Sequence, residues 1–131
     1  MAHIEKLTLS GSRSTPFVDF DPDGHRLRLR GQSYPENAFA FYEPLLKWLD
    51  RYLAGLDASA SVVAELRFPY INTTSTKCVL TLLEKLDEAY RGGADITVEW
   101  HADENDESEM ECAEEFREDL GLPFRIVPAA D

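Results

Sequence analysis

The sequence predicts an α/β domain that begins with a β-hairpin and continues with alternating helices and strands. Two short stretches of alternating apolar and polar residues flank the turn sequence DPDG, which has proline in second place and glycine in last. After them, amphipathic helical patterns alternate with runs rich in β-branched and aromatic residues. Helices of this length connect parallel strands by right-handed crossovers. We therefore expect one domain spanning residues 1–131, with a mostly parallel sheet and helices packed on it.

The hairpin follows from strict alternation of residue type. Residues 16–20 and 25–31 alternate apolar with polar side chains, so that Leu27 and Leu29 share one face of their strand while three arginines occupy the other. Arginines on such a face are more often solvated than part of an anion site. A further short strand is expected at residues 5–9.

The first helix is predicted within the stretch SYPENAFAFYEPLLKWLDRYLAGL. Its apolar stripe, at the three-to-four spacing of a buried helix face, comprises Phe41, Leu45, Trp48, Leu49, Tyr52 and Leu53. Ser33 and Asn37 are candidate caps. Because Pro44 has no backbone N–H to donate, we expect the helix to begin near Glu43 or to bend there. Gly55 should end it.

The second half of the chain predicts three strands and two helices. We expect strands at residues 61–70, 94–100 and 124–128, and helices after the hydroxyl-rich run up to residue 91 and over residues 109–121. The first of these helices shows its apolar pattern from Cys78 onward and is closed by a pair of glycines.

Composition places the chain among packed globular proteins. Hydrophobic residues make up 44% of the 131 residues, enough for one core. No apolar run approaches the roughly 20 residues that cross a bilayer, and the N-terminus lacks the basic and apolar regions of a secretory signal. Cys78 and Cys112 stand far apart and outside any CxxC or Cys/His cluster. We expect a cytoplasmic protein with reduced cysteines, no zinc site and no membrane insertion.

The net charge of −12 limits the classes of partner that we expect this protein to bind. Such a surface repels phosphate backbones, so nucleic acid is not expected as a partner. The charge is uneven, because residues 101–119 hold ten acidic side chains against Arg117, a net of −9. That segment is either a solvated helix and loop or an acidic docking face for a basic partner.

Motifs that carry catalysis are missing from the sequence. There is no Walker A, GxGxxG or HExxH motif. Residues 74–77 spell T-x-x-K, but the SDN and KTG motifs that accompany S-x-x-K in penicillin-recognising enzymes are absent. The histidines, none of which pairs with a nucleophile in the sequence, are His3, His25 and His101. A metal site in the acidic segment, from Asp103, Asp106 and Glu107, stays open as an enzymatic alternative, although its spacing fits no EF-hand. We expect no enzyme activity, cofactor or metal.

The stretch INTTSTK is the strongest candidate for a functional site. It holds four consecutive hydroxyl residues between Asn72 and Lys77, whereas capping a helix needs one or two. A phosphate on such a hydroxyl would be stabilised by the helix N-terminus and by Lys77, and it would add roughly −1.5 to −2 charge to an acidic surface. The pattern therefore suggests a phosphorylation switch.

Two resemblances sharpen this hypothesis. The element order, with a hydroxyl run between the strand at residues 61–70 and the second helix, resembles the anti-sigma-factor antagonist or STAS domain, in which a serine at this place is phosphorylated. The resemblance is closer to the SiaC family of bacterial regulatory phosphoproteins, and it covers nearly the whole chain. Its motifs here are STP at residues 14–16, GQSYPENAFAFYEPLLKWL at 31–49, YINTTSTK at 70–77 and AEEFREDLGLPF at 113–124.

The SiaC-like resemblance implies a STAS-like switch without catalysis. The resemblance implies that the phosphoacceptor is the threonine directly after the loop asparagine, here Thr73, with Thr74 and Ser75 as runners-up. A Ser/Thr protein kinase of the anti-sigma type adds the phosphate and a metal-dependent phosphatase removes it. The unphosphorylated form binds and activates a diguanylate cyclase, which raises cyclic di-GMP and favours biofilm. We expect the contact surface to comprise Asn72, Thr73, Thr74, Ser75, Lys77 and the exposed side of residues 78–90.

A conventional anti-sigma-factor antagonist remains the alternative, since the same loop serves both kinds of pathway. Only the identity of the partner separates the two.

Overall fold

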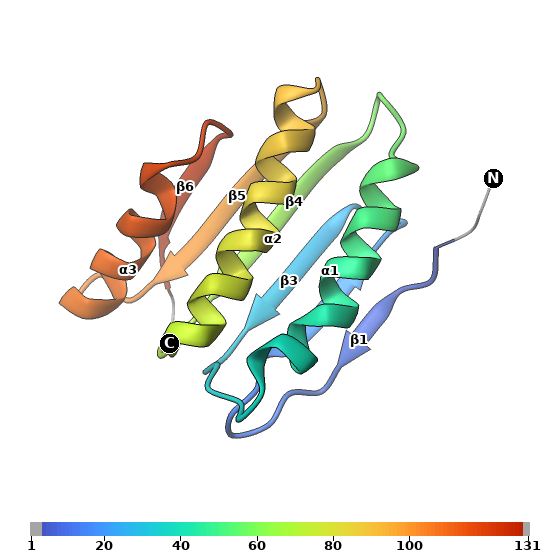
Figure 1. The fold of residues 1–131 in the computed structure, drawn as a ribbon. Helices are drawn as coiled ribbons and strands as arrows, with labels where there is room; N and C mark the ends of the chain where they lie inside the picture. Colours follow the sequence, from blue (N-terminus) through green and yellow to red (C-terminus); the bar gives the residue numbers. More distant parts are fainter. Residues whose placement is uncertain (1–3, 130–131) are drawn as a thin grey trace.

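The sheet runs from β1 to β6 in the order of the sequence, and three helices cover one of its faces (Figure 1). This computed structural model describes residues 4–129. Its strands are β1 (Leu7–Leu9), β2 (Phe17–Asp21), β3 (Arg26–Arg30), β4 (Ser61–Arg67), β5 (Asp95–Ala102) and β6 (Phe124–Pro128), and its helices are α1 (Ala38–Ala54), α2 (Thr73–Arg91) and α3 (Glu107–Glu118). The predicted α/β architecture with a mostly parallel sheet is confirmed.

The N-terminal strands form the antiparallel part of the sheet. β2 pairs with both β1 and β3, and Val18 lies opposite Leu29 across the hairpin. The Asp21 carboxylate closes the turn by accepting hydrogen bonds from the amides of Asp23 at 3.0 Å and Gly24 at 3.2 Å. The predicted hairpin around DPDG is therefore confirmed.

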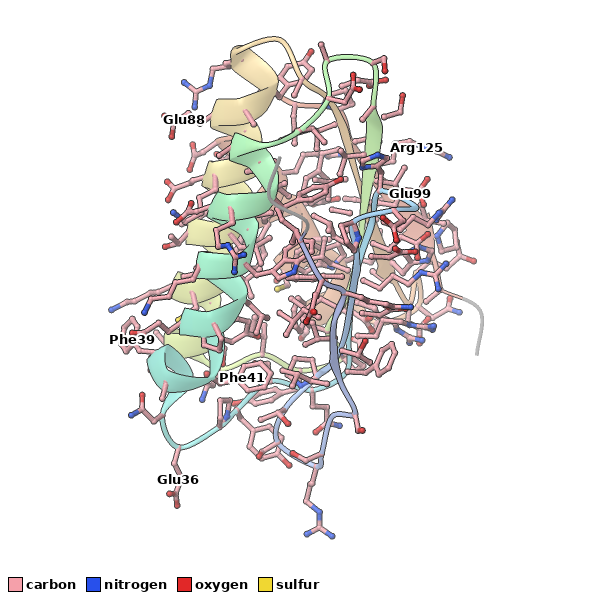
Figure 2. The ribbon with its side chains drawn as sticks, turned by 90° about the vertical axis from the view of Figure 1, so that its right-hand side faces the viewer. Glu36, Phe39, Phe41, Glu88, Glu99 and Arg125 are labelled. Atoms are coloured by element: carbon pink, nitrogen blue, oxygen red, sulfur yellow. The ribbon has the colours of Figure 1, made fainter. Side chains whose placement is uncertain are left out.

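All three helices lie on the same side of the sheet for a topological reason. The strands β3 to β6 pair in parallel, each with the next, and one helix joins each pair. Right-handed crossovers that step in one direction along a sheet place their helices on one face. The opposite face carries no helix within residues 4–129, and Glu99 and Arg125 project from it (Figure 2).

The core lies between the sheet and the helix layer. Trp100 of β5 is fully buried and stacks on Phe116 of α3, with 4.8 Å between the ring centroids. Leu45 of α1 and Leu83 of α2 are fully buried against the sheet as well. Strand residues on one face thus meet the apolar stripes of the helices. No helix within residues 4–129 is long and apolar enough to span a membrane.

The first helix begins earlier than expected. The Asn37 side chain caps it by accepting a backbone hydrogen bond at 3.0 Å, and the helix starts at Ala38. The expectation of a start near Glu43 is therefore wrong, and Pro44 lies inside the helix. Proline removes one helical hydrogen bond, but the complete burial of Tyr42 and near-complete burial of Ala38 hold the preceding turns against the core.

Other boundaries shift by a few residues. β4 ends at Arg67, before Pro69, rather than at residue 70. α3 starts at Glu107, because the Asp106 side chain caps it by accepting a hydrogen bond from a backbone amide at 3.1 Å. Side chains, rather than apolar periodicity, set these helix starts.

Candidate functional site

The hydroxyl-rich run forms the first turn of α2 rather than a loop before it. Asn72 is the N-cap: its side-chain oxygen accepts a hydrogen bond from the Ser75 amide at 2.9 Å, and its carbonyl accepts one from the Thr76 amide at 2.9 Å. The helix therefore begins at Thr73, well before Cys78. Because one asparagine makes the cap, the hydroxyl side chains are not needed for it.

The four hydroxyl groups lie in different environments. The side chains of Thr73 and Thr74 are exposed, and neither hydroxyl bonds to another residue within 4–129. Thr76 Oγ1 donates to the Asn72 carbonyl at 2.9 Å, and Ser75 is fully buried. Thr73 and Thr74 are therefore the most exposed hydroxyl residues of the run, whereas Thr76 is partly buried.

Ser75 belongs to a buried chain of three hydroxyl groups beneath the start of α2. Ser33 Oγ lies 2.9 Å from Ser75 Oγ and 2.7 Å from the Tyr42 hydroxyl, and all three side chains are fully buried. Burial raises the pKa of Tyr42 well above its ordinary value, so its hydroxyl stays protonated and able to donate. The chain links α1, the segment that precedes it and α2.

Backbone bonds join the same segments. The Ser33 amide donates to the Tyr70 carbonyl at 2.9 Å, and the Asn72 amide donates to the Ser33 carbonyl at 2.9 Å. The two strand-to-helix connections, before α1 and before α2, therefore lie side by side. Together with the buried hydroxyl groups, these bonds hold the first turn of α2 in one position.

Burial corrects one part of the sequence-based expectation. Ser75 was expected as a runner-up phosphoacceptor and as a partner contact, but its side chain has no exposed surface. The sequence alone does not show which way the third residue of a helix points. Asn72, Thr73, Thr74 and Lys77 all lie at the surface or are partly exposed.

The start of α2 suits an anion electrostatically. The amides of Thr73 and Thr74 precede the first intrahelical hydrogen bond, and the first turn contains no acidic residue. Lys77 is exposed and forms no ion pair with any residue that the structure describes. A phosphate on either exposed threonine would meet the positive end of the helix dipole and a nearby ammonium group.

Residues 9–129, nearly the whole chain, match the profile of the SiaC family regulatory phosphoproteins. The chain belongs to the SiaC family. The resemblance expected from the four motifs is thereby confirmed. An uncharacterised protein of Pseudomonas aeruginosa strain UCBPP-PA14 is 39% identical over 123 residues, which cover 94% of this chain and 96% of that protein.

Solved SiaC structures share the fold. Apo-SiaC from Pseudomonas aeruginosa is 36% identical and superimposes with a TM-score of 0.87 over 94% of this chain and 98% of that chain. Another structure contains the diguanylate cyclase SiaD in complex with its activator SiaC from the same organism. That match has 37% identity and a TM-score of 0.88, and it covers 94% of this chain and 99% of the matched chain.

Exposed aromatic rings lie near the start of α2, and the sequence analysis did not identify them as candidates. Tyr70, two residues before the Asn72 cap, is 52% exposed, and its ring packs edge-on against Tyr34 at 5.8 Å. Phe39 is 63% exposed and projects from the first turn of α1 at the same end of the molecule (Figure 2). Phe39 falls off the apolar stripe of α1, which is the signal that would have identified it. Exposed aromatic side chains are enriched in protein interfaces.

The carboxylates considered as a possible metal site in the acidic segment make other contacts. Asp103 Oδ1 accepts the Asn105 amide at 2.9 Å, and Asp106 caps α3. Within residues 4–129, no three His, Cys, Asp or Glu side chains are grouped as metal ligands. His25 Nδ1 lies 2.6 Å from the Tyr52 hydroxyl, whereas His3 lies outside the described residues.

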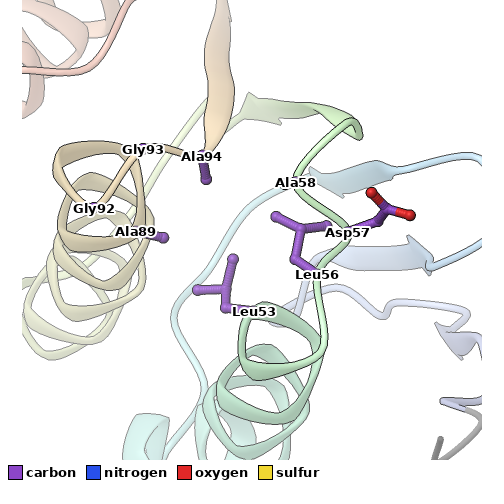
Figure 3. Close-up of a pocket in the computed structure, with 8 residues that line it drawn as sticks. All are labelled: Leu53, Leu56, Asp57, Ala58, Ala89, Gly92, Gly93 and Ala94. Carbon is purple, nitrogen blue, oxygen red and sulfur yellow. The ribbon is translucent and has the colours of Figure 1, made fainter.

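An apolar hollow of about 320 Å³ lies at the far end of the helix layer (Figure 3). Leu53 and Leu56 line one side of it, and Ala89 and Gly92 line the other. The helices α1 and α2 run in the same direction, so their C-terminal ends are remote from the start of α2 (Figure 1). The hollow is therefore separate from the first turn of α2.

We expect Asn72→Ala to lower the free energy of unfolding by about 1 kcal/mol, because the Ser75 amide would lose its side-chain acceptor. Asn72→Asp is the matched control: it keeps the acceptor, adds a favourable charge at the helix N-terminus and should be neutral or stabilising. Urea denaturation of the three proteins measures the difference. An equal loss of stability in Asn72→Ala and Asn72→Asp would show that the side-chain acceptor of Asn72 does not contribute to the free energy of unfolding.

Proposed function

We propose that this protein is a non-catalytic cytoplasmic switch whose unphosphorylated form binds and activates a diguanylate cyclase. In this proposal a Ser/Thr kinase of the anti-sigma type phosphorylates Thr73 and so prevents the binding, and a metal-dependent phosphatase restores it. The observation that carries the proposal is the match, over 94% of the chain, to a SiaC described as the activator of the cyclase SiaD. Family membership among regulatory phosphoproteins supports the phosphorylation step.

The geometry supports Thr73 as the acceptor. Its hydroxyl is exposed and unbonded within the described residues, at the first position after the cap. Thr74 shares this exposure and is the competing acceptor, whereas Ser75 is fully buried and the partly buried Thr76 donates its hydroxyl to the Asn72 carbonyl. A partner that contacts this turn would cover Thr73 and meet the neighbouring Tyr70 ring.

The proposal is tested by titrating the purified cognate cyclase with this protein and measuring cyclic di-GMP formed from GTP. We expect the unphosphorylated protein and Thr73→Ala to raise cyclase activity and the phosphorylated protein to leave it at its basal level. A pull-down with wild type and Thr73→Ala identifies the partner independently. Capture of an anti-sigma factor, with no effect on the cyclase, would instead support a conventional anti-sigma-factor antagonist.

Charge reversal at Lys77 should weaken partner binding about tenfold, equivalent to about 1.4 kcal/mol, with little effect on folding. Lys77 is exposed on α2 next to the proposed contact turn, and its side chain makes no ion pair within residues 4–129. Lys47→Glu is the matched control, because Lys47 is 72% exposed and lies on α1 in a surface pair with Glu43. Isothermal titration measures the affinities, and thermal unfolding checks the folds. Equal weakening by both variants would show a general charge effect and argue against this contact surface.

A further inference from the structure

A fully buried serine begins the inward face of α2, which is otherwise apolar along its first half. Ser75 is the first residue of this face, and Cys78, Val79 and Leu82 continue it. Burying a hydroxyl costs free energy unless it is hydrogen-bonded, whereas an apolar residue would anchor the same turn without that requirement. Departures from apolar packing of this kind are expected at functional positions. The hydrogen bonds of Ser75 therefore need a reason beyond burial.

These bonds form a chain with a definite direction. Ser33 Oγ donates to Ser75 Oγ at 2.9 Å. Because a hydroxyl has one proton to give, the Tyr42 hydroxyl, 2.7 Å from Ser33 Oγ, is the donor to Ser33. We refer to Tyr42, Ser33 and Ser75 as the hydroxyl chain. Hydrogen bonds are directional, unlike apolar contacts, so the hydroxyl chain constrains the rotation of the first turn of α2 as well as its depth.

This rotation decides where the neighbouring threonines point. Successive residues of a helix point about 100° apart, so with Ser75 facing the core, Thr74 lies about 100° round the helix and Thr73 about 200°. Thr73 therefore points almost directly away from the core. The exposures agree, because Thr73 and Thr74 are exposed and Thr76, on the other side of Ser75, is partly buried. A docked enzyme meets the two exposed threonines in different directions.

We propose that Tyr42 is a positioning residue that acts through Ser33 and Ser75 to present Thr73, rather than Thr74, to the kinase. The inference rests on the proposed function for the phosphorylation itself. In that step the threonine Oγ1 forms a bond to the γ-phosphorus of ATP, the bond from that phosphorus to the β-phosphate oxygen breaks, ADP leaves, and a base of the kinase takes the hydroxyl proton.

The choice of acceptor depends on small movements of the first turn. Phosphoryl transfer requires the acceptor oxygen within about 3–3.5 Å of the phosphorus and in line with the leaving group. Helix ends fray and open locally at a lower free energy than the whole protein unfolds. A frayed first turn would let Thr74 rotate into the direction that Thr73 otherwise occupies. Holding the turn closed therefore favours Thr73.

Tyr42 is suited to a test because it reaches the site only through other residues. Its side chain has no exposed surface, so an enzyme docked on the folded protein does not contact it. Tyr52 is the matched control: it also lies on α1, is 3% exposed, and its hydroxyl is 2.6 Å from His25 Nδ1. At about 1.5 Å for each residue, it lies about 15 Å further along the helix, away from the start of α2 (Figure 1).

The first measurement is native-state hydrogen exchange of the full chain by nuclear magnetic resonance, in wild type, Tyr42→Phe and Tyr52→Phe. The amides of Ser75 and Thr76 bond to the side chain and the carbonyl of Asn72 and so report opening of the first turn. We expect them to exchange about tenfold faster in Tyr42→Phe, and within about twofold of wild type in Tyr52→Phe. Amides in the middle of β4 report global unfolding and should change alike in both variants.

The second measurement is phosphosite mapping by mass spectrometry after incubation with the cognate kinase and ATP. The ratio of phosphate on Thr74 to phosphate on Thr73 should rise about fivefold in Tyr42→Phe and stay unchanged in Tyr52→Phe. A merely structural role of Tyr42 would lower stability without changing this ratio. Ser33→Ala breaks the hydroxyl chain at its centre, is equally buried, and should change the ratio in the same direction.

The two measurements separate this inference from the proposed function. Exchange of the Ser75 and Thr76 amides that is no faster in Tyr42→Phe than in Tyr52→Phe would overturn the inference. An unchanged phosphate ratio, or an equal change in both variants, would overturn it as well. Wild type that accepts no phosphate on either threonine would refute the proposed function and the choice of acceptor with it, whereas the exchange comparison would still decide whether the hydroxyl chain anchors the turn.

Discussion

Phosphorylation of Thr73 is expected to weaken binding to the output partner about a hundredfold, a loss of about 3 kcal/mol. A phosphate there carries roughly −1.5 to −2 charge and must shed water when a partner covers the first turn of α2. The start of α2 should also stabilise the phosphate in the free protein, through the amides of Thr73 and Thr74 and the ammonium of Lys77. Both effects favour the unbound state, so they add.

The measurement begins with phosphosite mapping by mass spectrometry after incubation with the cognate kinase and ATP. Partner affinity is then compared for the phosphorylated and unphosphorylated protein. Thr73→Ala should fold, resist phosphorylation and retain full affinity. Thr73→Asp should weaken binding less than the phosphate does, because it carries one charge and fewer acceptor oxygens.

Thr74→Ala is the matched control for the site, since Thr74 is the other exposed threonine of the turn. It should accept phosphate and lose affinity on phosphorylation as the wild type does. Phosphate found only on Thr74 would refute the assignment to Thr73. Unchanged affinity of the phosphorylated protein would refute the mechanism, whichever threonine is modified.

Apolar periodicity was sufficient to predict the architecture of this protein. The alternation of Leu27 and Leu29 with arginines is the half-buried strand β3, and the turn after Asp21 closes the hairpin. The stripe containing Leu45 and Leu49 is the buried face of α1. These features depend on neighbours within a few residues, and local sequence therefore encodes them.

The start of α2 could not be predicted in the same way, because its first turn has no apolar periodicity. In the sequence, Asn72 is as typical of a loop as of a helix cap. Its role as the cap depends on the conformation that it adopts. The burial of Ser75 depends on Ser33 and Tyr42, which are remote in sequence. Which hydroxyls of a polar run face the core is thus a property of tertiary packing.

The surface around the site was harder still to foresee. Phe39 and Tyr70 lie in different segments, and only the parallel arrangement of the strand-to-helix connections brings both to one end of the molecule. Arg30 and Arg67 become neighbours only through the register between β3 and β4. Neither the register of a parallel pair nor the side of the sheet left uncovered is visible in a single segment.

Loss of the Asp87 carboxylate is expected to destabilise the fold by about 2–4 kcal/mol. Asp87 is 2% exposed on α2, and its Oδ1 accepts hydrogen bonds from the amides of Gly121 and Leu122, each at 3.0 Å. These amides lie in the connection between α3 and β6, so one side chain fastens that connection to α2. In Asp87→Ala both amides lose their acceptor, and an unsatisfied buried donor costs about 1–3 kcal/mol.

Three further contributions affect the size of this destabilisation: one adds to it and two reduce it. Arg91 Nη2 also contacts Asp87 at 2.8 Å, but the arginine side chain is 70% exposed, so breaking that pair adds little. Removing a buried carboxylate relieves its desolvation, which offsets part of the cost. The Gly121 amide lies nearer the surface than that of Leu122 and will recover water more readily. The Leu122 amide therefore accounts for most of the expected destabilisation.

Asp87→Asn separates the hydrogen bonds from the charge. Its amide oxygen can accept from both backbone donors, so it should cost only about 1 kcal/mol relative to wild type. Urea denaturation at equal protein concentrations gives both values, with an unchanged slope showing that the unfolding transition is the same. If Asp87→Asn is as unstable as Asp87→Ala, the charge rather than its acceptor geometry holds the connection. If neither variant is destabilised, the bonds to Gly121 and Leu122 do not fasten the two segments, and other contacts of α3 with the sheet, among them Trp100 against Phe116 and Arg67 with Glu109, must hold it there.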